Sequence, residues 1–274
     1  MKSNALHKII VWLLLLAFMF FFLTPILWMT ISSLQPQENL MRENYRFTAD
    51  DIFGNYRSLF GDRKFLLALK NTFLITVFAS LLTIAFASSA AYAFSRYDFS
   101  GKKTSMFLVY SIQMGPAVAF LIPLFFIFRA IGLIDNIWAM ILAITTFTIP
   151  ISMWIMLGFY KSIPREIEES AVIDGCTRLQ TFLRIILPLA KPGMISACIV
   201  TFISVWGEML IALPLTLSKA TPLTVYASSF SGVYTTNFGG AAAVSVLSTL
   251  PVVIIVFVFR KYLLKGLVEG AVKG

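Results

Sequence analysis

Long apolar blocks alternate with shorter polar segments along the 274-residue chain. Each block is close to the length of about 20 residues that a helix needs to cross the hydrocarbon core of a membrane. A membrane has no water for backbone N–H and C=O groups, so blocks of this kind are expected to be helical. Six spans are predicted, at residues 9–31, 71–94, 104–129, 137–160, 193–213 and 241–259. The pattern therefore predicts an all-α integral membrane protein with six transmembrane helices.

The first apolar block follows the basic residues Lys2 and Lys8, an order that secretory signal peptides share. However, its apolar run, residues 9–31, exceeds the roughly 7–15 residues of a signal-peptide core. It also lacks a clear small-x-small cleavage site. We therefore expect a retained first span.

The longest polar interval in the second half of the chain covers residues 161–192. Its first part has the marks of a short helix, with Ser162 as a candidate N-cap and Pro164 in the first turn. Three glutamates within residues 166–169 lie at the positive end of the expected helix dipole. Gly175 is a natural C-terminal stop.

A second short helix is predicted after this stop. Thr177 and Gln180 are spaced as in a capping box, in which each side chain bonds the other residue's backbone N–H. Pro188 and Pro192 are expected to interrupt this helix. Apolar residues recur at four-residue spacing in the first helix, so we expect this folded, charged interval to dock against another surface.

The composition is that of a membrane protein. Hydrophobic residues make up 58% of the chain and the mean hydropathy is +0.85. Charged residues make up 13%, against about 25% in an average globular domain. The net charge of +9 would suit nucleic-acid binding, but the basic residues are scattered among loops and form no arginine-rich patch. We therefore expect the lipid bilayer, and no nucleic acid, as a partner.

The basic residues predict the orientation of the spans. If the N-terminus is cytoplasmic, most of the 22 Lys and Arg residues fall on the cytoplasmic side, in line with the positive-inside rule. The first loop, residues 32–70, is the exception, but it also carries acidic residues, and its aromatic residues indicate an ordered cap. Both termini and the interval 161–192 are therefore expected in the cytoplasm.

The sequence offers little for catalysis. Its one histidine, His7, lies outside the predicted spans, and its two cysteines, Cys176 and Cys198, form no CxxC motif. No metal-ligand spacing is present. A GxxxxGK[ST] loop is also missing, so the chain is not expected to hydrolyse ATP. We expect neither an enzyme nor a protein with a cofactor of its own.

One motif in the interval 161–192 resembles a known family. Glu169-Ser170-Ala171, followed by Asp174-Gly175 and then Ile185-Ile186-Leu187-Pro188, resembles the EAA signature of ABC-importer permease subunits, with Ser170 where alanine is usual. In that family the interval is the coupling loop, and its first helix, the coupling helix, sits in a cleft of the cytoplasmic ATPase subunit. The resemblance implies the type I permease fold. It assigns ATPase docking to Glu169, Ala171, Asp174 and Gly175.

Further stretches resemble the maltose-type carbohydrate branch of the same family. They are Ala91 to Arg96 with Phe99 to Lys102, Trp206-Gly207-Glu208, where Gly207 replaces a commoner Asn, and the tail from Gly266 to Gly274. The resemblance implies one membrane domain, residues 1–274, that imports a carbohydrate. It also implies three partners: a nucleotide-binding ATPase dimer that holds the ATP, a second permease subunit and an external solute-binding protein.

Two residues near the end of the fifth predicted span have more than one interpretation. Glu208 is the one carboxylate expected inside a span, where it serves either the translocation pathway or a hydrogen bond between helices. Trp206 either stacks on a sugar face or packs within the bundle. The polar loop 214–240 either meets the solute-binding protein or is a plain connector.

Other functions stay open at this level. A secondary transporter would need an ion or proton site in the spans, where Glu208 is nearly the only candidate, and the spans show no obvious inverted repeat. A membrane-embedded enzyme would need a catalytic cluster that the sequence does not show. An ABC permease for a solute other than a sugar is the nearer alternative.

Overall fold

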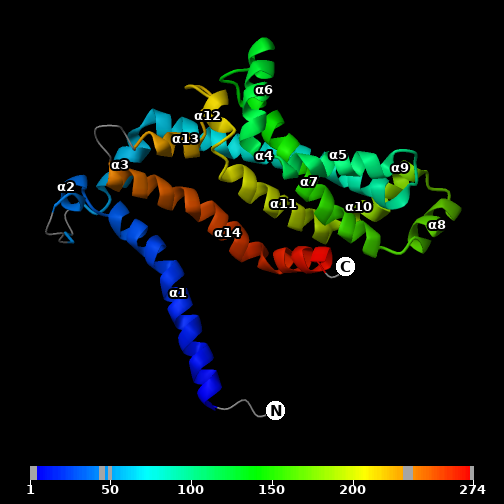
Figure 1. Cartoon of the computed structure of the whole chain (residues 1–274), viewed down its shortest axis with the longest axis horizontal. Helices are drawn as coiled ribbons and strands as arrows, with labels where there is room; N and C mark the ends of the chain where they lie inside the picture. The colour runs from blue at the N-terminus through cyan, green and yellow to red at the C-terminus, as the bar shows by residue number, and fades with distance from the viewer. Residues whose placement is uncertain (1–4, 43–46, 49–50, 231–236, 272–274) are drawn as a thin grey trace. The chain divides into compact units, whose positions relative to one another are not determined.

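The computed structural model describes residues 5–42, 47–48, 51–230 and 237–271 (Figure 1). Every regular element in these ranges is a helix, so the predicted all-α class is confirmed. The chain divides into two compact units, Met1–Leu66 with Tyr226–Leu250 and Leu67–Val225 with Pro251–Gly274. Helices α4 (Arg63–Arg96) and α14 (Phe238–Ala271) each contribute residues to both units.

Among the described residues, four helices are long and apolar enough to cross a membrane: α1 (Ala5–Ser33), α4, α7 (Ile137–Ser162) and α14. They correspond to the first, second, fourth and sixth predicted spans. Two bent pairs also qualify, α5 (Lys102–Met114) with α6 (Ala117–Ala130), and Arg178–Leu189 with α11 (Lys191–Trp206). The count reaches the predicted six when each bent pair is one span.

The third predicted span, residues 104–129, is not a single helix. α5 and α6 are separated by Gly115 and Pro116 and differ in direction by 101°. Gly115 has an extended backbone, with ψ of 146°. This conformation is expected before proline, whose ring disfavours the α region for the preceding residue. Pro123 lies inside α6 without ending it.

The helix in the fifth predicted span, residues 193–213, ends before the apolar run does. α11 stops at Trp206, with Gly207 as its C-cap. The Glu208 side chain accepts a hydrogen bond from the Ile211 N–H (2.9 Å), which holds a turn before the short helix α12 (Ala212–Leu215). Glu208 therefore lies beyond the helix, and the prediction that it sits inside a helical span is wrong.

α4 begins earlier than the predicted second span, residues 71–94. It contains 34 residues, or about 51 Å at 1.5 Å per residue, against about 30 Å for a hydrocarbon core. Part of this helix therefore extends outside the hydrocarbon. The basic residues Arg63, Lys64 and Lys70, which the sequence assigned to the first loop, are on this helix. Asp62 precedes it, and its carboxylate accepts a hydrogen bond from the Lys64 N–H (2.9 Å).

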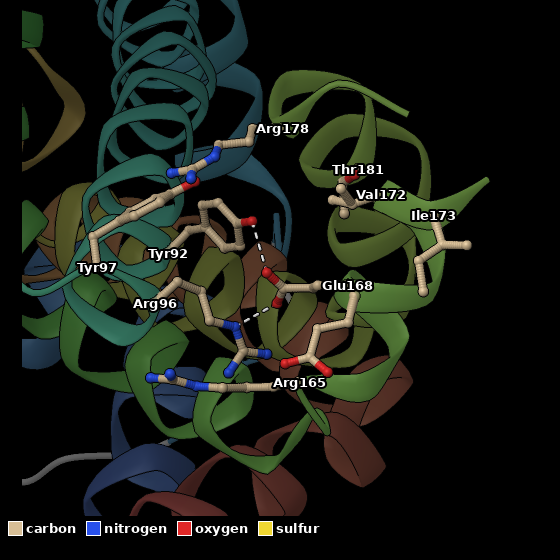
Figure 2. A pocket seen from close by; sticks show the side chains of 10 residues that line it. Tyr92, Arg96, Tyr97, Arg165, Glu168, Val172, Ile173, Arg178 and Thr181 are labelled. Carbon is tan, nitrogen blue, oxygen red and sulfur yellow. Dashed lines mark hydrogen bonds and ion pairs between the residues drawn. The ribbon is translucent and has the colours of Figure 1, made fainter. Parts of the chain in front are cut away.

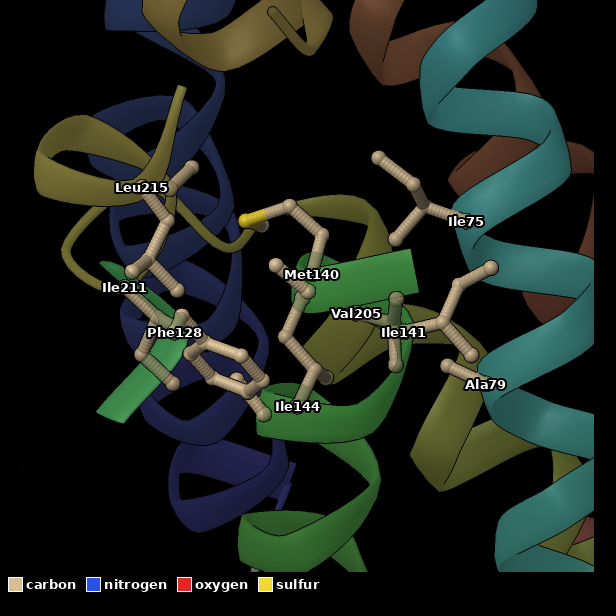
Figure 3. Packing of buried hydrophobic residues seen from close by; sticks show 12 residues of the cluster. Ile75, Ala79, Phe128, Met140, Ile141, Ile144, Val205, Ile211 and Leu215 are labelled. Atoms are coloured by element: carbon tan, nitrogen blue, oxygen red, sulfur yellow. The ribbon is translucent and has the colours of Figure 1, made fainter. Parts of the chain in front are cut away.

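Helix α7 is central to the unit Leu67–Val225 with Pro251–Gly274. It packs against α5 and α11, and most of its residues are buried. In Figure 3 its side chains meet those of α4, α6, α11 and α12 in one apolar cluster. The labelled members are Ile75, Ala79, Phe128, Met140, Ile141, Ile144, Val205, Ile211 and Leu215. A helix that is apolar on all sides is expected to be buried in this way.

Pairs of hydroxyl groups also join the helices of this unit. Two pairs join α4 to α7 and one joins α7 to α11. They are Ser88–Tyr160 (2.6 Å), Thr83–Thr148 (2.7 Å) and Ser152–Thr201 (2.8 Å). In lipid, where apolar burial does not favour one helix pair over another, such hydrogen bonds and close packing hold helices together.

The unit Met1–Leu66 with Tyr226–Leu250 has a polar centre around the buried Gln35. The Gln35 side chain donates to the Thr48 carbonyl (3.0 Å) and accepts from the Thr48 N–H (3.1 Å). Asn55 donates to the carbonyls of Ser33 (3.0 Å) and Gln35 (2.9 Å). The short helices α2 (Gln37–Leu40) and α3 (Gly54–Gly61) lie in the same segment. The described part of the first loop is thus folded, as predicted.

Candidate functional site

The first helix that lies wholly within the coupling loop, residues 161–192, is α8 (Glu166–Ile173), the predicted coupling helix. Its N-cap is Arg165, so the prediction of Ser162 as N-cap is wrong. Ser162 is the last residue of α7, where its hydroxyl donates to the Phe159 carbonyl (2.8 Å). Pro164 explains the difference. It forces Ile163 into an extended conformation (ψ 122°), so it separates α7 from α8 and does not open α8.

The predicted stop at Gly175 is confirmed. Gly175 has φ of +85°, a left-handed conformation that glycine adopts without a Cβ penalty. Its N–H bonds the Val172 carbonyl (3.0 Å), and the Cys176 N–H bonds the Ala171 carbonyl (2.9 Å). These two bonds form a Schellman motif, which satisfies carbonyls at the end of α8.

The predicted capping box opens the next helix, α9 (Arg178–Thr181). The Thr177 N–H bonds the Gln180 side chain (2.8 Å), and the Gln180 N–H bonds the Thr177 hydroxyl (3.3 Å). The chain continues as a π-helical turn, η1 (Phe182–Ile186), and α10 (Leu187–Leu189). A bend of 73° then separates these elements from α11. Pro188 therefore does not end the helix, and the interruption falls at Ala190, just before Pro192.

The four predicted docking residues do not share one environment. Glu169, Asp174 and Gly175 are exposed, whereas Ala171 is buried against the rest of the unit. The side chains of Val172 and Ile173 are also exposed, and Ile173 has 86% of its surface accessible. Exposed carboxylates next to exposed aliphatic side chains give α8 a surface suited to a protein partner.

Glu168, which sequence reasoning did not assign to the site, anchors α8. Its carboxylate forms an ion pair with Arg96, at the end of α4, and accepts a hydrogen bond from the Tyr92 hydroxyl (3.0 Å). Arg96 also donates to the Ile163 carbonyl (2.9 Å). Figure 2 shows Glu168 pointing toward both α4 side chains. The side chains of Arg96 and Glu168 are 7% and 17% exposed, so the pair is mostly removed from solvent.

Aromatic rings extend this contact between α4 and the coupling loop. The Tyr92 ring lies 4.6 Å from that of Phe182 in η1. The Arg178 guanidinium lies over the Tyr97 ring, 5.4 Å from its centroid, at cation–π distance (Figure 2). Tyr92, Tyr97 and Arg178 border a cavity of about 470 Å³ that is also lined by Arg165 and Glu169.

Trp206 and Glu208, for which the sequence left two interpretations, both have contacts within this chain. Trp206 is 6% exposed, and its ring stacks on that of Phe202 with 5.4 Å between centroids. Besides the bond from Ile211, Glu208 accepts a hydrogen bond at its backbone carbonyl from the Thr224 hydroxyl (2.8 Å). These contacts join the end of α11 to α13 (Leu223–Ser228).

Asp135 lies in the connection between α6 and α7 and holds a second loop, residues 217–220. One oxygen of its carboxylate accepts the backbone N–H groups of residues 217–220 at 2.9–3.0 Å. Its own N–H bonds the Leu215 carbonyl (2.9 Å), and its φ of +59° is one that aspartate tolerates. Burial raises the pKa of this carboxyl, but the four backbone N–H donors outweigh burial and hold the pKa well below its usual value.

Comparison with known proteins assigns the chain to a family. Residues 83–269 match the model of the binding-protein-dependent transport system inner membrane component. The chain is 34% identical over 255 residues to the trehalose transport system permease protein SugB of Mycobacterium tuberculosis, with 92% of this chain and 93% of that protein covered. It is 31% identical to the trehalose/maltose transport system permease protein MalG of Thermococcus litoralis over the full length of both.

The fold is shared with a solved structure of a bacterial ABC transporter involved in the import of the acidic polysaccharide alginate. The TM-score is 0.81 with 24% identity, over 96% of this chain and 98% of the other. The structural match supports the type I permease fold. The match to the family model covers the coupling loop and the contacts that anchor it. The chain therefore belongs to the binding-protein-dependent inner membrane components and is a permease subunit of an ABC importer.

Proposed function

We propose that this permease translocates a carbohydrate across the cytoplasmic membrane. The supporting observation is its similarity, over nearly its whole length, to several permeases named for sugar substrates. Besides SugB and MalG, the maltodextrin transport system permease protein MdxG of Bacillus subtilis is 30% identical over 99% of this chain. A solute other than a sugar is the alternative that the experiments below address.

The proposed mechanism uses α8 as the contact with a cytoplasmic ATPase dimer. Glu169, Asp174 and Gly175 face this partner, while Ala171 packs the helix onto its own chain. ATP is bound by the ATPase subunits, so this chain needs no cofactor of its own. Closure of the ATPase dimer displaces the coupling loop, and the spans then rock largely as rigid bodies between inward and outward openings.

A second permease subunit and an external solute-binding protein complete the proposed complex. All six spans of this chain form one membrane domain, with both termini and the coupling loop in the cytoplasm. The distribution of basic residues supports this orientation. The loop 214–240 then lies on the outer face, where Asp135 holds residues 217–220 and the loop meets the solute-binding protein. Glu208 and Trp206 shape the wall of the translocation pathway by fixing the end of α11.

Co-purification tests the ATPase contact. We expect Glu169→Gln to lower recovery of the ATPase with the tagged permease, because it removes an exposed charge on the docking face. Glu166→Gln is the matched control, an exposed glutamate in the first turn of the same helix. Equal recovery of the ATPase with both variants and the parent would show that the Glu169 carboxylate has no part in docking.

Reconstituted transport tests the substrate. The assembled complex, with its solute-binding protein, should hydrolyse ATP faster when a trehalose- or maltose-type sugar is added and should accumulate that sugar in vesicles. Stimulation by an amino acid or an inorganic ion, with no response to a panel of mono- and oligosaccharides, would replace the carbohydrate proposal by the alternative.

A further inference from the structure

The end of α4 and the turn after it, residues 91–102, have no role in the function proposed so far. Their side chains contact four other elements of the same unit. Tyr92 meets Tyr160 of α7, Glu168 of α8 and Phe182 of η1, and Tyr97 lies beside Arg178 of α9. This segment is therefore the point at which α4 joins the coupling loop.

Arg96 makes the most specific of these contacts. Its Nε pairs with Glu168 of α8, and its Nη2 donates to the carbonyl of Ile163, the C-cap of α7. One guanidinium thus links α4, α7 and α8. Arginine suits this position because its donors are fixed in a planar fork and stay charged at any physiological pH.

The Arg96–Glu168 pair differs from the other ion pairs in the described part of the chain. Arg57–Asp51 and Lys102–Asp98 each join near neighbours in sequence and have at least one largely exposed partner. Arg96 and Glu168 lie 72 positions apart and are mostly buried. Removing one partner of a buried ion pair leaves the other charge uncompensated, which is strongly unfavourable. The pair therefore resists movement of α8 away from α4.

We propose that Arg96 makes α4 move together with the coupling helix, so that displacement of α8 reaches the second span directly. This inference rests on the proposed contact between α8 and an ATPase. Arg96 acts as a positioning residue, because it touches Glu168 and Ile163 and not the transported solute. Without it, α8 passes its displacement mainly to the spans that flank the coupling loop in sequence, α7 and α11.

A distance measurement on the parent complex tests the common movement. Spin labels are placed at Ser89 of α4 and Glu166 of α8, both exposed, after replacement of Cys176 and Cys198 by serine. The distance between the labels should be the same in nucleotide-free and ATP-bound complexes. A distance that changes between the two states would overturn the proposal.

Variants test the role of the charge pair. Arg96→Gln should lower the amount of solute transported per ATP hydrolysed about tenfold, because the charged hydrogen bond to Glu168 is lost. The charge-reversed double variant R96E/E168R should recover part of this ratio, because it restores the ion pair but not the hydrogen bond to the Ile163 carbonyl. Lys102→Gln is the control, since Lys102 forms the exposed pair with Asp98 in the same turn, and it should keep the parent ratio.

The outcomes separate this inference from the function on which it rests. If no ATPase co-purifies with the parent chain, the proposed function fails. If the ATPase co-purifies but Arg96→Gln transports as much solute per ATP as the parent, only the role of Arg96 fails. It also fails if the double variant recovers nothing, because the loss would then not come from the charge pair. If Arg96→Gln does not assemble, the spin-label distance in the parent complex decides.

Discussion

Gly193 of α11 packs closely against Phe159 of α7. A Cβ built on Gly193 would lie 2.4 Å from the Phe159 ring, a distance that real Cβ atoms do not adopt. Gly193 lies in the first turn of α11, just after the bend that ends the coupling loop. The absence of a side chain there lets the two helices that flank the coupling loop touch, as small residues do between membrane helices.

Gly193→Ala should therefore push α11 away from α7. We expect a loss of about 1–3 kcal/mol of stability, the usual cost of overpacking, and a lower rate of transport. The measurement is the thermal midpoint of the purified permease together with solute uptake. Gly61→Ala is the control, because no atom lies within 4 Å of a Cβ at that position. Equal midpoints for the two variants would contradict the packing argument.

Gly175 tests backbone conformation without a change in packing. A Cβ at this position would meet no atom within 4 Å, so only its φ of +85° penalises a side chain. Gly175→Ala should cost about 1 kcal/mol and weaken recovery of the ATPase. Gly175→Asn should be milder, because asparagine adopts the left-handed conformation more readily. If alanine and asparagine have the same effect, the conformation of Gly175 is not what matters.

The hydrogen bonds of the Asp135 carboxylate predict that the stability of the protein depends on pH. The folded-state pKa of its carboxyl is lowered. The ionised carboxylate, bonded to the backbone of residues 217–220, therefore contributes stability above the unfolded pKa of about 4. That contribution is lost as pH falls through the folded pKa. Asp135→Asn should therefore be less stable than the parent at pH 7, by about 1–2 kcal/mol, and the gap should narrow below pH of about 4.

Thermal midpoints of the parent and the Asp135→Asn variant, measured across this pH range, provide the check. Asp98→Asn is the comparison variant. Asp98 is fully exposed, and its pKa is also lowered, mainly by its hydrogen bond to Lys102. A gap for Asp135→Asn that stays constant down to the lowest pH would show that the charge of the carboxylate does not hold the loop.

The hydroxyl pair Ser152–Thr201 predicts a measurable coupling between α7 and α11. In a double-mutant cycle with Ser152→Ala and Thr201→Val, the coupling energy should be about 0.6 kcal/mol, as is typical of hydrogen bonds between membrane helices. Ser204 is a control for the second position, because its hydroxyl bonds only the Val200 carbonyl of its own helix. Additive effects of Ser152→Ala and Thr201→Val would contradict a functional bond between the helices.

Features set by neighbouring residues were predictable from the sequence alone. The apolar blocks located the spans, because a helix must be about 20 apolar residues long to cross a membrane. Thr177 with Gln180, and Gly175, marked helix ends because their bonds reach only three or four residues along the chain. The sequence-based prediction was wrong where two local signals compete. Pro164 can begin a helix or end one, and here it ends α7. Gly207 ends α11 although the apolar run continues.

Contacts between distant residues depended on the tertiary structure. Nothing in the spacing of Arg96 and Glu168, 72 positions apart, pairs them, and the same holds for Asp135 with residues 217–220 or Phe159 with Gly193. Each contact exists because helices packed in three dimensions bring side chains to one place. The sequence by itself determined the membrane class, the spans and the coupling motif, whereas only the packed helices decided which residue of α4 holds the coupling helix.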